Sequence, residues 1–231
     1  MRQLDQSGFV IHARDYGETS QIVDMLTPDG GRVSMVHKGA RQRRKGGGGP
    51  LQPFTRYGFG WIGRTQLKTL ISPEIQQHFT LTGNSLAAGF YINELIWYLV
   101  HHEDECVGIY QAYESCLTRL AESAEQLEIP LRRFERLLLE EMGYALQWHQ
   151  EATSGAPINP DQDYFFRFGE GFYTEAGEAG DLQLSGAEIL AVAAEQYEDQ
   201  LTRSVAKQLF RRALAELLNG RELQSRKLLR S

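Results

Sequence analysis

The chain has 231 residues, of which 42% are apolar and 23% charged, and its formal net charge at pH 7 is −6. This composition is typical of a globular protein with one large or two smaller domains, and it excludes a disordered tail, a collagen and a coiled-coil rod. The longest apolar run, residues 95–100, is far shorter than the roughly 18 residues of a membrane span. The N-terminus lacks the apolar core of a secretory signal, and two cysteines cannot form a disulfide framework. We therefore expect a cytoplasmic protein with no membrane contact.

The charge is distributed in three blocks. Residues 1–80 hold 11 Lys and Arg against 6 Asp and Glu, residues 81–200 hold 5 against 22, and residues 201–231 hold 8 against 2. Binding to a phosphate backbone depends on the local field, so a basic N-terminal block is compatible with nucleic-acid binding despite the negative total. The alternative is that blocks of this size occur in ordinary soluble proteins without such a partner.

Residues 7–78 contain short runs with the composition of β-strands, separated by glycine-containing turns. The runs are 8–15, 21–26, 32–39, 54–62 and 65–72. Short strands in such close succession predict a small closed barrel. Because a barrel of this size has a small core, we expect it to pack against the rest of the chain.

A basic, glycine-rich segment joins the third and fourth predicted strands. Five of the eight residues 38–45 are Lys or Arg, and four glycines and Pro50 follow them. Arg and Lys neutralise phosphates and release counterions, so we interpret the segment as a mobile phosphate clamp. The alternative is a solvated loop without a partner, which the repulsion among neighbouring cations disfavours. The glycine run is not a Walker motif, because it lacks the GK[ST] ending.

Tyr57, Phe59 and Trp61 alternate along the fourth predicted strand and therefore share one of its faces. Two roles are open to them. They can form a platform on which bases stack, or they can fill the barrel core. We favour the core, because a small barrel needs large side chains inside it.

The rest of the chain predicts mainly helices. The first begins at Asn84 or Ser85 and ends near Val100, and its apolar residues on nearly every side predict burial. Glu94 within it needs a partner, for which we expect an arginine. The other predicted helices are 105–127, 131–143, 185–195 and 201–218. Between them, residues 144–181 are rich in Gly, Pro and aromatic residues and predict an irregular segment with a short β-hairpin.

The sequence has no HExxH, CxxC, EF-hand or GxSxG motif. Residues 101–105 combine two histidines with three acids, but adjacent residues on a helix point in different directions and cannot chelate one ion together. We interpret them as a solvated helix end. The sequence therefore predicts neither catalytic residues nor a metal site.

Short motifs in a fixed order resemble those of a known family. They are GETS (17–20), GRV (31–33), HKGAR (37–41), LQPF (51–54), KTL (68–70), YINEL (91–95), LRRFE (131–135), MGY (142–144) and SRKL (225–228). With the basic segment between GAR and LQPF, the whole chain resembles the RecO family of bacterial recombination mediators and DNA repair proteins. The resemblance implies an α+β fold, with an N-terminal OB-fold β-barrel (1–80) followed by an α-helical domain (81–231) that carries the small hairpin insertion.

The resemblance also implies a function without catalytic turnover. RecO proteins bind single- and double-stranded DNA and anneal complementary strands, and with RecR they help to load RecA onto DNA coated by the single-strand binding protein SSB. Some relatives bind zinc through four cysteines in the segment that matches residues 144–181. Here that segment has no cysteine, so we expect no metal and no cofactor. We expect packing of Trp148, Tyr164, Phe166 and Phe172 to hold the segment instead.

Two sets of cations are candidate binding sites. The candidates for DNA are Arg32, Lys38, Arg41, Arg43, Arg44 and Lys45, with Arg56, Arg64 and Lys68 in second rank. The acidic tail of SSB ends in an apolar residue and needs an apolar pocket rimmed by cations. The candidates for that tail are Arg132, Arg133, Arg203 and Lys207. For Arg132 or Arg133 the alternative is a buried ion pair with Glu94.

Two other functional classes stay open at this point. One is a protein-interaction adaptor whose barrel does not bind DNA. The other is a nuclease, which would need a cluster of carboxylates that holds Mg²⁺.

Overall fold

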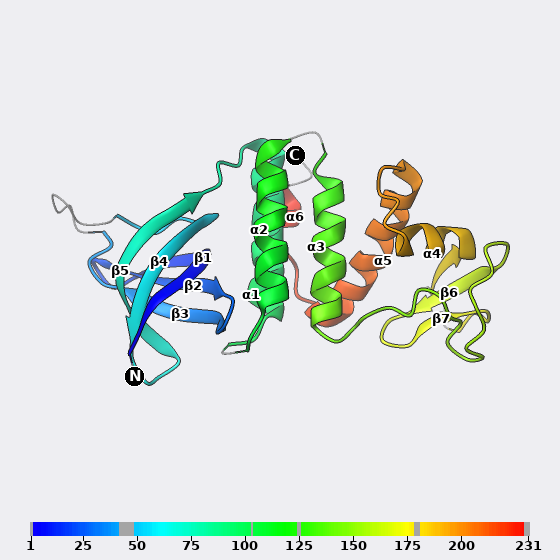
Figure 1. Ribbon diagram of the computed structural model, residues 1–231, viewed down its shortest axis with the longest axis horizontal. Helices are drawn as coiled ribbons and strands as arrows, with labels where there is room; N and C mark the ends of the chain where they lie inside the picture. Colours follow the sequence, from blue (N-terminus) through cyan, green and yellow to red (C-terminus); the bar gives the residue numbers. More distant parts are fainter. Residues whose placement is uncertain (1, 42–48, 103, 124–125, 178–180, 229–231) are drawn as a thin grey trace. The chain divides into compact units, whose positions relative to one another are not determined.

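The computed structural model describes residues 2–41, 49–102, 104–123, 126–177 and 181–228. Its first strands are β1 (Arg2–Tyr16), β2 (Ser20–Thr27), β3 (Gly31–His37), β4 (Thr55–Ile62) and β5 (Leu67–His78). They form a closed barrel in the order β1-β2-β3-β5-β4 (Figure 1). Strands β3 and β5 pair in parallel, and the other described pairs are antiparallel. This arrangement confirms the predicted OB-like barrel, since the OB-fold is a five-stranded Greek-key barrel.

The barrel core is built from alternate residues of its strands. In β3, Val33 and Met35 point inward while their neighbours are half-exposed. Tyr57, Phe59 and Trp61 belong to the same core, and they are 4%, 4% and 7% exposed. Their role in the core is confirmed, and the alternative of a stacking platform is wrong because their rings are covered by the barrel itself.

The helices are divided between two compact units. The barrel unit comprises residues 1–127 and 223–231, and the helical unit comprises residues 128–222. Besides the barrel, the barrel unit contains α1 (Gly83–Leu99), α2 (Val107–Glu122) and the short α6 (Ser225–Leu228). The helical unit contains α3 (Glu128–Glu141), β6 (Asp163–Arg167), β7 (Gly171–Tyr173), β8 (Leu182–Ser185), α4 (Gly186–Ala193) and α5 (Gln200–Leu218). The boundary predicted near residue 80 lies between the barrel strands and α1 and stays a prediction, whereas the two compact units divide the chain at residue 127.

A β-bulge in β1 explains why α1 belongs with the barrel. The pairing of β1 with β2 skips Ile11, so its carbonyl is left out of the ladder. The Asn93 side chain in α1 donates to this carbonyl at 2.9 Å, and its own carbonyl accepts from the Tyr113 hydroxyl of α2 at 2.6 Å. All three residues are buried. This chain of hydrogen bonds therefore connects the barrel wall to both helices.

The segment around residues 224–225 contacts helix α1 at Glu94, the residue after Asn93. The Glu94 carboxylate accepts from the backbone amides of Gln224 and Ser225 at 3.1 and 2.9 Å, and also from the Ser225 hydroxyl. The prediction of an arginine partner for Glu94 is wrong, because the first amides of α6 satisfy the carboxylate. Helix α1 also begins earlier than predicted, at Gly83, with Thr82 as its N-cap.

The segment without cysteines is held by aromatic packing, as predicted. Trp148, Tyr164, Phe166 and Phe172 are all buried in the helical unit, and the ring of Phe172 lies 6.0 Å from that of Trp148 and 5.7 Å from that of Phe166. The sequence missed β8, which pairs with β6 to complete a three-stranded sheet. Ser185 and Glu188 form the capping box that opens α4. Within the residues described, no helix is long and apolar enough to cross a membrane.

Replacing Asn93 by Ala is expected to destabilise the protein by about 2–4 kcal/mol, because it leaves the buried Ile11 carbonyl and Tyr113 hydroxyl without partners. Urea unfolding followed by circular dichroism measures the loss. Tyr113→Phe is the matched control, because it removes one of the two hydrogen bonds and should cost about 1–2 kcal/mol. Equal losses in the two variants would contradict the assigned role of Asn93.

Candidate nucleic-acid interface

The N-terminal side of the basic segment is fixed to the turn between β1 and β2. The Arg41 guanidinium lies 2.5 Å from the Asp15 carboxylate and donates to the carbonyls of Gly17 and Glu18 at 2.6 and 2.8 Å. The Arg41 backbone amide donates to the Thr19 carbonyl at 3.0 Å. Arg41 therefore holds the turn and has little of its charge left for a phosphate.

The C-terminal side of the same segment is fixed to the same hairpin. The Gln21 side chain accepts from the Leu51 amide at 3.0 Å and donates to the Leu51 carbonyl at 3.3 Å. Both residues are buried. The two described ends of the segment thus lie at one end of the barrel. The candidates Arg43, Arg44 and Lys45 lie outside the described residues.

Arg32 belongs to a polar cluster around Asp24 and not to the basic segment. The Asp24 carboxylate is buried and accepts from the Ser34 hydroxyl and, at 3.3 Å, from the Trp97 indole N–H, while His12 Nδ1 lies 3.4 Å away. The Arg32 guanidinium lies 5.8 Å from the centre of the Trp97 ring. Burial raises the pKa of Asp24, but the hydrogen bonds from His12 and Ser34 and the charge of Arg32 lower it more, so the net pKa is below its ordinary value.

Two second-rank candidates are engaged within the barrel unit. The Arg56 guanidinium lies 2.6 Å from the Glu114 carboxylate of α2, and it also lies over the Phe9 ring. Lys68 is only 7% exposed, and its ammonium lies 5.0 Å from the centre of the Trp61 ring. Contacts of this kind stabilise the barrel and leave less of either cation to face DNA.

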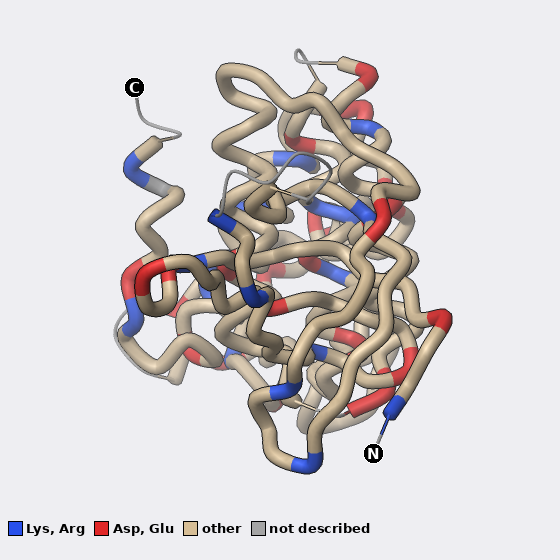
Figure 2. Tube along the Cα trace, turned by 90° about the vertical axis from the view of Figure 1, so that its left-hand side faces the viewer, with Lys and Arg blue, Asp and Glu red and all other residues tan. Residues whose placement is uncertain are grey.

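The candidates with exposed side chains lie at opposite ends of the barrel. Lys38 follows β3, whose last residue pairs with Gln21 beside the β1/β2 turn. Arg64 lies in the turn between β4 and β5, at the end where β1 begins. Figure 2 shows Lys and Arg at both ends of the barrel. Arg14 is also exposed but was not among the candidates, because only the β1/β2 pairing brings it next to the residues that hold the ends of the basic segment.

The structure brings three of the four SSB-tail candidates together around one acid, Glu128. Lys207 donates to its carboxylate at 2.7 Å, and Arg203 lies 3.8 Å from it. The hydrogen bond from Lys207 is the main cause of a lowered pKa for Glu128, to which the charges of Lys207, Arg132 and Arg203 add. We call these four residues the Glu128 cluster.

The two adjacent arginines of α3 differ in their surroundings. Arg132 is buried and donates at 2.8 Å to Glu135, which is fully buried. A buried partner was the alternative considered for Arg132, but the partner is Glu135 and not Glu94. Arg133 is exposed and lies 3.3 Å from Glu195. Arg133 thus lies apart from the cluster.

No group of three His, Cys, Asp or Glu residues within the described ranges could hold a metal ion. Cys106 and Cys116 are buried, and the Cys106 thiol donates to the Thr27 carbonyl at 3.2 Å.

Comparison with known proteins agrees with this fold. Residues 1–79 match the family model "Recombination protein O N terminal", and residues 81–227 match "Recombination protein O C terminal". The chain belongs to the RecO family of DNA repair proteins. It is 38% identical to the DNA repair protein RecO of Cellvibrio japonicus, over 99% of this chain and 97% of that protein. It is 39% identical to RecO of Methylococcus capsulatus, over 100% of this chain and 94% of that protein.

The Asp24 cluster predicts a pH-dependent stability. A carboxyl whose pKa is lower in the folded than in the unfolded protein contributes stability above its unfolded pKa of about 4, and that contribution is lost as the pH falls below this value. Asp24→Asn is expected to cost about 2 kcal/mol at pH 7, since hydrogen bonds to a charged group are lost, and less at pH 3. Urea unfolding of both proteins at the two pH values measures this. A difference that does not shrink in acid would contradict the assignment.

Proposed function

We propose that this chain is a recombination mediator that acts by binding and not by turnover. It binds single- and double-stranded DNA through the barrel, anneals complementary strands, and together with RecR helps to load RecA onto SSB-coated single strands. The observation that carries the proposal is the anchoring of both ends of the basic segment, through Arg41 and Leu51, to one end of an OB-like barrel. Membership of the RecO family supports it.

Within this proposal the cations have different roles. Arg43, Arg44 and Lys45 contact phosphates, and the exposed Lys38 and Arg14 of the barrel add to the positive charge there. Arg41 holds the first part of the segment in place, because its guanidinium is already bound by the Asp15 carboxylate and by the carbonyls of Gly17 and Glu18. Annealing needs two like-charged strands held close with their base edges uncovered, and a cationic segment with a glycine-rich connection can provide that.

Changing Arg41, Arg43, Arg44 and Lys45 to Ala is expected to weaken binding of single-stranded DNA strongly. If about six phosphates are contacted and the three contacts of Arg43, Arg44 and Lys45 are lost, the slope of log affinity against log salt falls in magnitude from about 4 to about 2. Fluorescence anisotropy of a labelled oligonucleotide across a salt series measures both the affinity and the slope.

The matched control removes the same charge elsewhere on the surface. Arg119, Arg211, Arg212 and Arg221 are exposed on α2, on α5 and just after α5, and their change to Ala should leave the salt slope near the wild-type value. Similar loss of affinity in both variants would mean that only overall charge matters. If the wild-type protein does not bind DNA even at low salt, the proposal is wrong and the alternative of a protein-interaction adaptor is favoured.

For the SSB tail we propose the Glu128 cluster as the binding site. Lys207 is about half-exposed. In the free protein its ammonium is paired with the Glu128 carboxylate, and in the complex with SSB a carboxylate of the acidic tail takes the place of Glu128. Arg132 is a poor test of this site, because its removal leaves the fully buried Glu135 without its cation. Arg133 lies outside the cluster, so it serves as the comparison residue.

Two opposite changes test the cluster. Lys207→Ala is expected to weaken binding of a labelled SSB-tail peptide several-fold, whereas Glu128→Gln is expected to strengthen it, because the internal competitor loses its charge. Neither change should affect binding of naked DNA. Anisotropy titrations with the peptide and with an oligonucleotide measure this, with Arg133→Ala as the matched charge removal. A Glu128→Gln protein that binds the peptide less tightly would overturn the site.

A further inference from the structure

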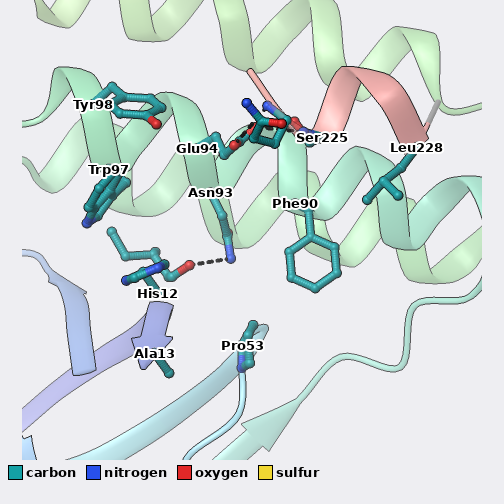
Figure 3. Close-up of a pocket in the computed structure, with 12 residues that line it drawn as sticks. His12, Ala13, Pro53, Phe90, Asn93, Glu94, Trp97, Tyr98, Ser225 and Leu228 are labelled. Carbon is teal, nitrogen blue, oxygen red and sulfur yellow. Dashed lines mark hydrogen bonds between the residues drawn. The ribbon is translucent and has the colours of Figure 1, made fainter. Parts of the chain in front are cut away.

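A pocket of about 470 Å³ lies in the barrel unit, between the barrel wall and helix α1. Helix α1 contributes Phe90, Asn93, Glu94 and Trp97, and the facing wall consists of His12 and Ala13 of β1 with Pro53 of the segment before β4 (Figure 3). Leu228 of α6 lies at one side. The volume is in the range of small-molecule sites.

The walls of the pocket are flat and mainly apolar. Phe90, Glu94 and Trp97 are spaced so that they lie on one face of α1, and Tyr98 beside them is a third aromatic residue of the lining. The His12 ring lies 5.0 Å from the Trp97 ring. Planar rings with exposed faces or edges favour a planar partner, such as a base.

The polar groups of the pocket are largely fixed by the protein itself. The Asn93 amide is used by Ile11 and Tyr113, the Glu94 carboxylate by Gln224 and Ser225, and the Trp97 indole N–H by Asp24. His12 differs from them. Its Nδ1 is directed to Asp24, while its Nε2 makes no hydrogen bond within the described part of the chain, and the side chain is 39% exposed. His12 can therefore offer one ring nitrogen to the edge of a ligand.

Charge decides between possible occupants. None of the residues that line the pocket is Lys or Arg, and Glu94 is the one acidic residue among them. An acidic peptide would find no cation there, so the pocket does not suit the tail of an acidic partner. A neutral, planar group with hydrogen-bonding edges suits it.

The pocket borders the proposed DNA site. Ala13 lies two residues before Asp15, which holds Arg41, and Pro53 lies two residues after Leu51, which is bound by Gln21. The pocket wall is thus continuous in sequence with the residues that hold the two ends of the basic segment. A strand whose phosphates are bound there would run past the mouth of the pocket.

We propose that this pocket takes up one unstacked base of a DNA single strand, with the base against the Phe90 ring and one of its edges toward His12 Nε2. This inference rests on the proposed DNA binding and adds to it a preference for single strands. A base inside a duplex is already stacked and paired, and taking it out costs a few kcal/mol. Double-stranded DNA therefore binds through phosphates alone and does not use the pocket.

The test fills the pocket from two walls. Pro53→Phe and Leu228→Trp each add a ring to the lining, and Ile75→Trp is the matched control, because it adds a ring at a position of β5 that is 68% exposed and outside the pocket. The readouts are anisotropy with single- and double-stranded oligonucleotides, and fluorescence of an aminopurine placed in the single strand. Thermal unfolding shows that each variant is folded, and Leu228→Trp keeps the test valid if Pro53→Phe does not fold.

We expect both filling variants to lose about tenfold in affinity for the single strand, the effect of losing one stacked base, and to abolish the aminopurine signal. Their affinity for the duplex should equal that of the control. Filling variants that bind the single strand like wild type overturn the pocket but leave the proposed DNA binding intact. An equal loss for both kinds of DNA also overturns it. If the wild type binds no DNA at all, the proposed function fails first and the base site with it.

Discussion

The barrel unit depends on a single unpaired carbonyl. The bulge in β1 removes the Ile11 carbonyl from the sheet, and a buried carbonyl without a donor costs about 1–3 kcal/mol. Asn93 supplies the donor, which fixes the position of α1 along the barrel, and Tyr113 then fixes α2 through the same side chain. The position of α1 in turn sets Phe90 and Trp97 opposite β1 and so creates the pocket. Asn93 thus joins the wall to both helices, beside the contacts of Trp97 with Asp24 and of Arg56 with Glu114.

The motifs that carried the family resemblance are often two ends of one contact. Arg41 of HKGAR binds the carbonyls of GETS, and Ser225 of SRKL binds Glu94 of YINEL. The LRRFE motif contains its own pair, Arg132 with Glu135. The glycine of GRV lies against the carbonyl of His101, where a side chain would be too close. In physical terms these short motifs mark the places where segments far apart in the sequence meet.

Local patterns were enough to predict most of the elements. Alternation predicted the strands, and the buried face of Tyr57, Phe59 and Trp61 followed from the size of the barrel. Charge partners could not be predicted in the same way, because they depend on which segments meet in space. Arg56 and Lys68 look like surface cations in the sequence, yet Glu114 and the Trp61 ring engage them. The same limit explains the partner of Glu94, which comes from the other end of the chain, and the exposed Arg14, which stood out only once β1 and β2 were paired.

The barrel unit is discontinuous in sequence, and this affects the order in which it can be completed. During synthesis Glu94 is made long before Ser225, and the whole helical unit is made between them. Until α6 has been synthesised, the Glu94 carboxylate lacks the amides of Gln224 and Ser225, and one side of the pocket lacks Leu228. The barrel can close early, since its strands are all near the beginning, but the wall beside α1 is finished last. A nascent chain stalled within the helical unit therefore carries a closed barrel with an incomplete pocket.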